Sequence, residues 1–568
     1  MQNTTHKTCH RVVDLLASRG VTHAVVSPGS RNAPLLVALS REERIAKVVV
    51  VDERSAGFVA LGISAATHRA VAVVCTSGTA VLNLAPAIAE AYYQQCPLLV
   101  ITADRPQAWI DQNDSQTMRQ NGVFANFVKK SYSLPSTIES DEQSWYVNRI
   151  LNEAYFEATS GTCRPVHINI HIGEPIYSLC EAADSGFRPI DRAESTETLA
   201  SAQAKTLAER VARSRRVMVV CGFMHPDERL EASLRALSQR DNVVVLAEHL
   251  AQIEGERVVN CIDAALSAMP LERNADFAPD LLIYVGGAPV SRLMKQFLRA
   301  HAAQAEQWRV GLDENIIDTM QGLTMQVHTD AACFFNALMA HDAAICQSDY
   351  SAIWQHLLRT GLQSARDFAS CQPWSDFKAM NMIMHSPLGD VMLHLSNGLT
   401  VRYAQLFERQ PRVAYLCNRG VSGIDGCTST ALGASLVSEK PVLLITGDMS
   451  FAYDVNGLAS QYNSSRLKIV VICNDGGGIF RFIKGPSALP ELEQYFEVKR
   501  HIDVAKYAAA FGFVYFEAAS EENLSQNLRR LLACDKAAIL AVTTPGEINA
   551  GVLRNFYNRT KNRINNKQ

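Results

Sequence analysis

The chain has 568 residues, of which 48% are hydrophobic and 20% charged, and its formal net charge is −3. At roughly 150 residues per domain, this length predicts three or four domains, each with its own core. The nearly neutral charge indicates no nucleic-acid partner, and no apolar run is long enough to predict an integral membrane segment.

Strand patterns alternate with helical patterns along the whole chain, which predicts an α/β protein with doubly wound parallel sheets. The first block, residues 1–184, has a predicted helix at 10–19 and predicted strands at 24–27, 48–51, 70–75, 97–102 and 166–170. A polar stretch at 184–201 is typical of a linker.

The second block, residues 202–363, has predicted strands at 217–221, 243–246, 281–285 and 308–311, and it ends near a polar stretch at 364–376. It has no persuasive Gly-rich dinucleotide fingerprint, so we expect neither flavin nor nicotinamide there. The third block, residues 377–568, has a first predicted strand at 413–417, followed by strands at 441–446, 467–472 and 539–543.

The fourteen cysteines are scattered singly, several of them inside apolar runs, and no Cys-x-x-Cys pair occurs. This usage is typical of small buried hydrophobes in a reducing compartment. We therefore expect a cytoplasmic protein without disulfides or a zinc site.

Polar residues close two of the apolar runs in the third block. Asp448 follows one run and Asn474 follows the next, 26 positions later, which leaves room for one crossover helix between parallel strands. Ligands of such sheets bind at the carboxyl ends of the strands. A carboxylate, an amide oxygen and the backbone carbonyl of Gly476 would suit Mg²⁺, which completes its octahedron with diphosphate oxygens. The alternative is a pair of ordinary strand-end turns.

Glu53 occupies a similar place in the first block. The run at 48–51 leads into Asp52-Glu53-Arg54-Ser-Ala-Gly-Phe-Val-Ala-Leu-Gly62, where small residues would let a helix approach a neighbouring domain closely. An isolated Glu at this place is usually only a favourable charge in the first turn of a helix.

Arginines follow several predicted strands or open a domain. Ser27-Pro-Gly-Ser-Arg31 and Thr102-Ala-Asp-Arg105-Pro lie in the first block, and Arg402 and Asn418-Arg419-Gly-Val-Ser-Gly-Ile-Asp-Gly426 lie in the third. Any one of them alone is typical of a surface ion pair. Together they favour substrates with several carboxylates, because the guanidinium fork binds carboxylates bidentately.

These motifs, with Gly447-Asp-x-Ser-x-x-x-Asp-x-Asn-x-Leu458, resemble those of thiamin diphosphate-dependent enzymes. Within that class the chain is most similar to the 2-succinyl-5-enolpyruvyl-6-hydroxy-3-cyclohexene-1-carboxylate synthases of menaquinone biosynthesis. The resemblance implies three domains of the decarboxylase and carboligase type: pyrimidine-binding (1–184), central (202–363) and diphosphate-binding (377–568). It also implies a homodimer or homotetramer with shared active sites, and the substrates 2-oxoglutarate and isochorismate.

The resemblance assigns roles to particular residues. Glu53 would contact N1′ of the aminopyrimidine as the catalytic carboxylate, and Ile424 would hold thiamin diphosphate bent. Mg²⁺, or Mn²⁺ in its place, would be bound by Asp448, Asn474 and Gly476. The remaining cofactor contact is Ser422, and the predicted substrate contacts are Arg31, Arg105, Gln116, Arg292, Arg402, Arg419, Ile479, Phe480 and Ile483. Plain core packing is an equal alternative for Ile483.

Some positions depart from the family pattern: Cys473 replaces an Asn, Gly398 a Ser, Ser291 a Lys, and Ser115 an Asn. Two other interpretations stay open, of which the changes at positions 398, 291 and 473 motivate the second. One is another thiamin-dependent decarboxylase or carboligase, similar to acetolactate synthase, which would not need the arginines. The other is a catalytically silent paralogue that serves as a binding subunit, although such a subunit would not need Glu53, Asp448 and Asn474 together.

Overall fold

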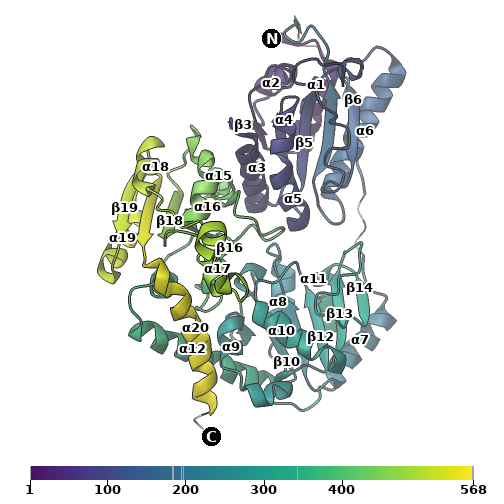
Figure 1. Ribbon diagram of the computed structural model, residues 1–568. Helices are drawn as coiled ribbons and strands as arrows, with labels where there is room; N and C mark the ends of the chain where they lie inside the picture. Colours follow the sequence, from purple (N-terminus) through teal and green to yellow (C-terminus); the bar gives the residue numbers. More distant parts are fainter. Residues whose placement is uncertain (1, 182–183, 194, 196, 342, 566–568) are drawn as a thin grey trace.

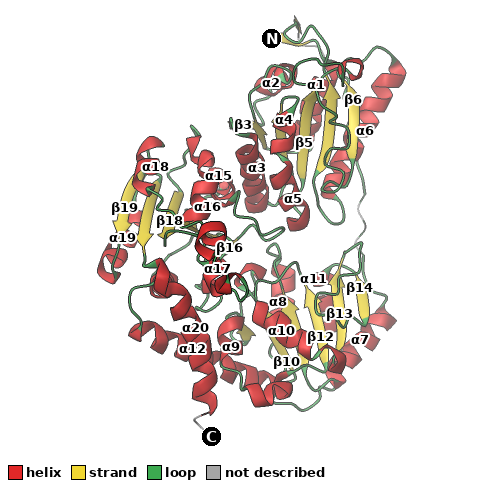
Figure 2. Cartoon of the chain, in the orientation of Figure 1, coloured by secondary structure: helices red, strands yellow, loops and turns green. Residues whose placement is uncertain are grey.

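The structure, a computed structural model, describes residues 2–181, 184–193, 195, 197–341 and 343–565. Three six-stranded parallel sheets with helices on their faces form three bodies of similar size (Figures 1 and 2). The predicted α/β class with parallel sheets is therefore confirmed. The sheets span residues 23–171, 217–328 and 392–543, whereas the exact domain limits stay a prediction.

The first body begins with α1 (Lys7–Ser18), and its sheet has the order β3-β2-β4-β5-β7-β6. Its strands are β2 (His23–Val26), β3 (Ala46–Val49), β4 (Val71–Cys75), β5 (Leu98–Asp104), β6 (Ser131–Pro135) and β7 (Val166–His171). Its other helices are α2 (Ala33–Ser40), α3 (Glu53–Thr67), α4 (Thr79–Asn83), α5 (Ala85–Gln94) and α6 (Asp141–Thr159). A separate antiparallel pair joins β1 (Gln2–Thr4) to β8 (Leu179–Glu181).

The central body has the strand order β11-β10-β9-β12-β13-β14. Its strands are β9 (Val217–Cys221), β10 (Val243–Ala247), β11 (Val258–Val259), β12 (Leu281–Val285), β13 (Glu306–Gly311) and β14 (Met325–His328). Its helices are α7 (Ser201–Arg213), α8 (Glu228–Leu237), α9 (Ile262–Ser267), α10 (Arg292–Ala300), α11 (Ala331–Met339) and α12 (Tyr350–Cys371).

The third body has the strand order β16-β15-β17-β18-β20-β19. Its strands are β15 (Met392–Leu395), β16 (Ala414–Leu416), β17 (Val442–Gly447), β18 (Leu467–Cys473), β19 (Val514–Ala518) and β20 (Ala538–Thr543). Its helices are α13 (Asp376–His385), α14 (Thr400–Ala404), α15 (Cys427–Val437), α16 (Asp448–Tyr453), α17 (Ile479–Phe482), α18 (Val504–Ala510), α19 (Glu521–Ala533) and α20 (Gly546–Asn565).

The first and third sheets share one topology. Numbered within each sheet, both have the order 2-1-3-4-6-5, whereas the central sheet has the order 3-2-1-4-5-6. In both orders, successive strands are added first to one side of the first strand and then to its other side. Ligands of doubly wound sheets bind at this switch point, outside the carboxyl ends of the strands. In the third sheet the switch point lies between β15 and β17, which places the loop after Leu395 beside Asp448.

Continuous apolar sequence explains the central strands. Every residue of β4, β5 and β18 is buried, because helices cover both faces of each sheet. The strands that the sequence did not predict are mostly short or partly exposed ones with mixed polarity, such as β6, β14 and β19. Their sequences lack the long apolar run on which the predictions relied.

Two sequence predictions need correction. The 413–417 run is not the first strand of the third sheet, because β15 precedes it and β16 lies at the edge. The strand before Glu53 is Ala46–Val49 instead of 48–51, and Val51 is 75% exposed. Within the polar 364–376 stretch, α12 continues to Cys371 with its apolar side buried.

Helix α3 packs directly on α15 of the third body, as the small residues after Glu53 predicted. A Cβ at Gly62 would lie 2.0 Å from the carbonyl oxygen of Thr430, and one at Gly433 would lie 2.1 Å from the carbonyl oxygen of Val59. Only glycine allows this approach of the two backbones. The contact fixes the first body against the third.

Candidate active site

The carboxyl ends of β15, β17 and β18 surround a pocket of about 340 Å³, here called the Asp448 pocket. Its lining includes the predicted cofactor and metal residues Ser422, Ile424, Asp448, Asn474 and Gly476. Gly398, Ile479 and Phe480 line it as well. The structure thus brings together residues that are spread over more than 80 positions of the sequence.

Asp448 is buried at the end of β17. Its Oδ2 accepts the backbone N–H groups of Asn474 at 3.1 Å and Asp475 at 2.9 Å. Burial raises its pKa to about 7, and the hydrogen bonds from these N–H groups and that of Met449 oppose the rise. A cation beside this carboxylate would compensate for its lost hydration.

The Asn474 side chain has a defined orientation. Its Nδ2 donates to Oδ2 of Asp376 at 2.7 Å, which leaves Oδ1 without a hydrogen bond among the described residues. Gly476 has a φ of +150°, and a Cβ there would lie 2.8 Å from the carbonyl oxygen of Glu497. Glycine is therefore required where the loop turns back on itself.

This donor set fits a hard cation such as Mg²⁺, since it offers a carboxylate, an amide oxygen and a backbone carbonyl. No group of three or more His, Cys, Asp or Glu side chains in the described part of the chain is placed to hold a metal ion. A metal at Asp448 would therefore need further oxygens from its ligand, as diphosphate oxygens could supply.

The loop after β16 carries three predicted site residues: Arg419, Ser422 and Ile424. It is held by Glu90 of α5, whose carboxylate accepts the N–H groups of Gly420, Val421 and Ser422 at 2.6, 2.7 and 3.3 Å. Burial raises the pKa of Glu90, and these hydrogen bonds with that of Gln94 oppose the rise. The first body thus fixes a loop of the third.

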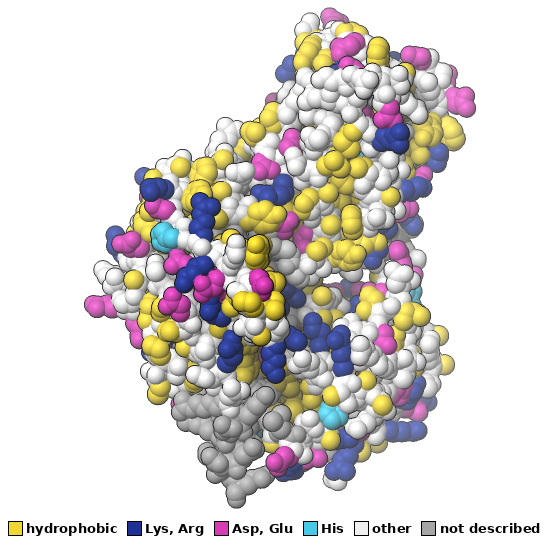
Figure 3. Space-filling view, in the orientation of Figure 1, with side chains coloured by type: hydrophobic (Ala, Val, Ile, Leu, Met, Phe, Trp, Pro, Cys, Tyr) yellow, Lys and Arg dark blue, Asp and Glu magenta, His cyan; other side chains and the backbone are white. Residues whose placement is uncertain are grey.

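A neighbouring cavity of about 580 Å³, here called the Arg402 cavity, is lined by Arg292 and Arg402. Ile479 and Ile483 line it too, with Lys484 and Arg554. None of the residues in α17 is buried, and Ile483, the residue that ends this helix, is not buried either. Exposure to the cavities favours a role in lining the pocket over core packing for Ile479, Phe480 and Ile483. Lys and Arg side chains gather over α10 and α17 (Figure 3).

The predicted arginines of the third body interact with one another. Burial lowers the pKa of Arg402, and the positive charges of Arg419 and Arg292 lower it further, while Asp263 opposes them. Arg419 is buried, and its Nε has no hydrogen-bond partner among the described residues. Such a group of cations needs anions, which a substrate with carboxylates would supply.

Ser291, which replaces the expected Lys, has another role. It caps α10 through the N–H of Met294, and its hydroxyl donates to the buried Asp263. Lys295 lies one helical turn further on. Burial lowers its pKa, as do the charges of Arg419 and Arg402, so a lysine does accompany the arginines from another position.

The predicted residues of the first body lie elsewhere. Glu53 accepts a hydrogen bond from Asn83 at 3.3 Å, and Arg31 contacts the carbonyl oxygen of Ile172 and the carboxylate of Glu174. Arg105 donates to the carbonyl oxygen of Ser115, beside Gln116. None of Glu53, Arg31, Arg105 and Gln116 lines either cavity of the third body.

Three residues of the site were missed: Glu90, Lys295 and Asp376. A lone Glu in the apolar run Ala85-Pro-Ala-Ile-Ala-Glu90-Ala could have indicated a buried carboxylate. Asp376 carries no such signal, since an acidic residue is common in the first turn of any helix. Their roles depend on contacts between segments that are distant in sequence.

Comparisons with known proteins agree with this geometry. Residues 6–123 match the N-terminal thiamine pyrophosphate-binding domain of thiamine pyrophosphate enzymes, and residues 398–542 match the C-terminal one. Three curated relatives carry the name 2-succinyl-5-enolpyruvyl-6-hydroxy-3-cyclohexene-1-carboxylate synthase. That of Porphyromonas gingivalis is 41% identical, with 96% of each chain covered. Those of Phocaeicola vulgatus and Cytophaga hutchinsonii are each 36% identical, with 97% and 96% of this chain and 98% and 97% of the relative covered. The chain therefore belongs to the 2-succinyl-5-enolpyruvyl-6-hydroxy-3-cyclohexene-1-carboxylate synthase family of thiamine pyrophosphate-dependent enzymes.

Proposed function

We propose that the protein removes CO₂ from 2-oxoglutarate and adds the remaining succinyl unit to isochorismate. The product would be 2-succinyl-5-enolpyruvyl-6-hydroxy-3-cyclohexene-1-carboxylate, an intermediate of menaquinone biosynthesis. The single observation that carries the proposal is the junction of the Asp448 pocket with the Arg402 cavity, which share Ile479 and Tyr403. A cofactor site thereby adjoins a cationic site that suits carboxylate-bearing substrates.

Thiamin diphosphate supplies the electron sink for decarboxylation when it is bound. Asp448, Asn474 and the carbonyl of Gly476 would hold its diphosphate through Mg²⁺ or Mn²⁺. Ile424, 36% exposed at the pocket, would support its bent shape, and Ser422 would contact it. Glu53 would hold the proton at N1′ of its aminopyrimidine.

Arg402 and Arg419 would bind carboxylates of the substrates, and Arg292 lines the same cavity as Arg402. Ile479, Phe480 and Ile483 would exclude water from the reacting atoms. Arg31, Arg105 and Gln116 would bind the isochorismate part, provided that they reach the site from another subunit.

A second copy of the chain would complete the site. Glu53 lies outside the Asp448 pocket of its own chain, and the apolar side chains of Val51 and Leu82 near it are 75% and 46% exposed. Val421 and Tyr453 of the third body are also more than half exposed. A homodimer, or a tetramer of two such dimers, would cover these faces and bring Glu53 of one subunit to Asp448 of the other.

No helix of the described residues combines the length and the apolar character that a membrane crossing requires. All fourteen cysteines are free thiols, and seven of the eight that are buried belong to the hydrophobic cores. We place the protein in the cytoplasm on the ground of this thiol usage.

The test is product formation by the purified protein with thiamin diphosphate, Mg²⁺, 2-oxoglutarate and isochorismate, with each component omitted in turn. We expect isochorismate consumption that needs all four, with a succinyl adduct in the mass spectrum. Release of CO₂ without an adduct would keep the cofactor chemistry but refute the acceptor.

The same assay separates the alternatives. Turnover of pyruvate without turnover of 2-oxoglutarate would favour an acetolactate synthase-like carboligase. Tight cofactor binding without any turnover would favour the silent paralogue. The interaction of Arg402 with Arg419 and Arg292 argues against the acetolactate synthase-like carboligase, because an enzyme for monocarboxylates has no use for three interacting cations.

A further inference from the structure

Asp376 is a buried carboxylate in contact with the predicted metal site, and no sequence motif marks it. It is the first residue of α13 and only 2% exposed, at the beginning of the third body. Charged side chains are rarely this buried unless other groups satisfy them. Its hydrogen bonds therefore indicate what it does.

Both carboxylate oxygens of Asp376 are used. Oδ2 accepts Nδ2 of Asn474 at 2.7 Å, and Oδ1 accepts the hydroxyl of Thr544 at 2.5 Å. Its backbone N–H donates to Oδ1 of Asn549 at 2.9 Å. Asp376 thus connects three segments: the start of α13, the loop after β18, and the segment between β20 and α20.

The contact with Asn474 decides the direction of an amide. Both oxygens of Asp376 accept hydrogen bonds in the structure, so it is the NH₂ group of Asn474 that faces Asp376. Oδ1 of Asn474 then faces away from Asp376, into the Asp448 pocket that both residues line. With the opposite orientation, Asn474 would present NH₂ to a cation and could not bind it.

We propose that Asp376 is a positioning residue that holds Asn474 in the orientation required for metal binding. The proposal rests on the proposed function, because it takes Asn474 as a ligand of the metal that holds the diphosphate. Groups that orient metal ligands typically contribute about 10- to 100-fold to metal affinity. A purely structural role, as a charge in the first turn of α13, would leave the metal affinity unchanged.

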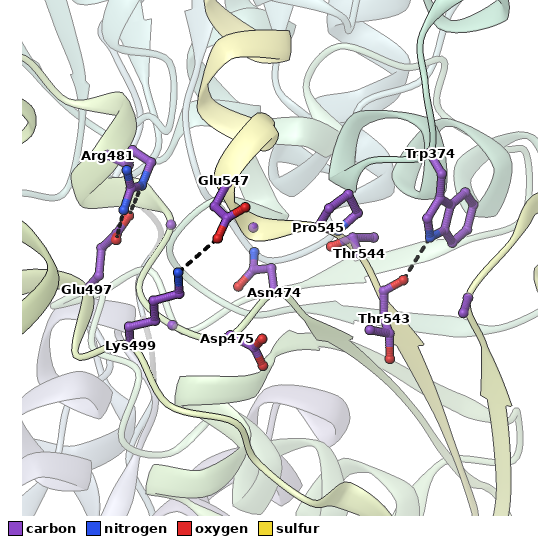
Figure 4. Close-up of a pocket in the computed structure, with 14 residues that line it drawn as sticks. Trp374, Asn474, Asp475, Arg481, Glu497, Lys499, Thr543, Thr544, Pro545 and Glu547 are labelled. Carbon is purple, nitrogen blue, oxygen red and sulfur yellow. Dashed lines mark hydrogen bonds and ion pairs between the residues drawn. The ribbon is translucent and has the colours of Figure 1, made fainter.

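The neighbouring contacts support a rigid orientation. The backbone of Asn474 is enclosed, because a Cβ at Gly546 would lie 2.2 Å from its carbonyl oxygen. The N–H of Thr544 donates to the carbonyl oxygen of Cys473 at 2.9 Å. Figure 4 shows Asn474 and Thr544 in the lining of one cavity, to which the loop after β18 contributes. With the backbone fixed, the side-chain amide keeps one main freedom, a flip of its end, and Asp376 prevents it.

The same view contains a reporter of the site. The indole N–H of Trp374, two residues before Asp376, donates to the carbonyl oxygen of Thr543 at 2.7 Å (Figure 4). Its fluorescence should therefore respond to changes in this cluster. Four other charged groups of this cavity are paired with each other, Lys499 with Glu547 and Arg481 with Glu497, and Asp475 contacts His501.

The variant Asp376→Asn tests the proposal. The new amide at position 376 can either accept from Asn474 or donate to it, so the amide of Asn474 is no longer held in one orientation and can present NH₂ to the metal. We expect the Mg²⁺ concentration for half-maximal thiamin diphosphate binding to rise about 10- to 100-fold. The measurement is a Mg²⁺ titration at fixed thiamin diphosphate, followed by tryptophan fluorescence and by calorimetry.

Two further variants make the test specific. Thr544→Val removes the other hydrogen bond of the same carboxylate, and it should change the Mg²⁺ requirement by less than about threefold. The double variant Asp376→Asn with Asn474→Asp exchanges the two groups. It restores the hydrogen bond with an oxygen facing the metal, so it should recover most of the lost affinity even if the single variant folds poorly.

The outcomes separate the failure of this proposal from failure of the proposed function. If the unmodified protein shows no Mg²⁺-dependent binding of thiamin diphosphate, the proposed cofactor site is wrong. If the unmodified protein binds and Asp376→Asn binds equally well, Asp376 has no positioning role. An exchange variant that folds but binds no better than Asp376→Asn would overturn the proposal as well.

Discussion

The two halves of the proposed site differ in how complete they are within one chain. The Asp448 pocket is assembled: Asp448 accepts two N–H groups, Asn474 is held by Asp376, and the Arg419 loop is held by Glu90. Glu53 has one hydrogen bond, to Asn83, and lies beside exposed apolar residues. The difference indicates that the proposed diphosphate half is preformed within one chain, whereas Glu53 would need a second subunit to reach the cofactor under the proposed function.

The largest expected effect comes from the assembled half. Among the described residues, two carboxylates line the Asp448 pocket, those of Asp448 and Asp376. Asp448→Ala removes the one that is proposed as a metal ligand. We expect no Mg²⁺-dependent binding of thiamin diphosphate by calorimetry, and hence no turnover. Asp475→Ala is the matched control, because the half-exposed side chain of Asp475 contacts His501 and only its backbone contacts Asp448. Equal loss in both variants would contradict the assignment.

The next effect concerns the open half. Glu53→Gln should keep the fold and thiamin diphosphate binding but lose about 10²- to 10⁴-fold in turnover, because proton transfer through the aminopyrimidine is impaired. Steady-state rates and cofactor titration measure the two properties separately. Glu43→Gln, at an exposed Glu before β3, serves as control. A fully active Glu53→Gln variant would refute the assignment of Glu53.

A mixing experiment tests whether Glu53 and Asp448 of one active site come from two different subunits. Glu53→Gln and Asp448→Ala chains are unfolded, mixed and refolded together. If sites are shared between subunits, a mixed dimer has one site with both native residues, and random pairing restores roughly a quarter of the native activity. If each chain forms its own site, no activity returns. Refolded native protein gives the reference.

A smaller effect is expected where the first body holds the loop of the third. Glu90→Gln replaces one acceptor oxygen by an NH₂ group that faces backbone N–H groups, which costs about 1 to 3 kcal/mol. We expect a lower thermal midpoint and a higher KM, with kcat changed less, because the Arg419 loop loses its fixed position. An unchanged KM would mean that Glu90 serves only the stability of the domain contact.

The smallest effect concerns pH and the contact of the central body with the first. Burial lowers the pKa of His225 to about 4, helped by the charge of His68, while its hydrogen bond with the carbonyl oxygen of Gln94 opposes the shift. The contribution of neutral His225 is complete above the unfolded pKa of about 6.5 and is lost as the pH falls toward 4. His225→Gln should therefore reduce the loss of stability between pH 6.5 and 4, by at most about 3 kcal/mol. Urea unfolding midpoints of the variant and the native protein, measured from pH 6.5 to 4, report this loss of stability. An equal dependence of the two midpoints on pH would contradict the expectation.

The sequence predicted the buried parts of the fold well. Continuous apolar runs indicated the central strands, and the polar residues that end them, Asp448 and Asn474, indicated the pocket. The 26-residue separation correctly predicted neighbouring parallel strands, since β17 pairs with β18. The sequence failed at the edges of the third sheet: it did not predict β19, and it placed β16 first, although β15 precedes it.

The sequence predicted site residues only where a residue of suitable chemistry directly follows a predicted strand or belongs to a known motif. The proposed metal and cofactor residues follow strands and carry recognisable motifs, so the sequence allowed a residue-by-residue prediction. Asp376, Glu90 and Lys295 act through segments that are far from them in sequence, and any of the three would look ordinary in isolation. Ser291 is the opposite case, because the sequence marked it as a departure from the family pattern. The structure places Lys295 one helical turn further along α10, where it can supply the positive charge that Ser291 lacks.

By itself the sequence determined the class of fold, the family and the strand ends at which the cofactor residues lie. Those properties depend on local patterns: apolar runs, glycines, and polar residues at fixed spacing. Only the tertiary structure decided which groups orient them. The direction of the Asn474 amide, the position of the Arg419 loop and the separation of Glu53 from Asp448 arise from contacts between distant segments, and such contacts leave no local pattern in a chain.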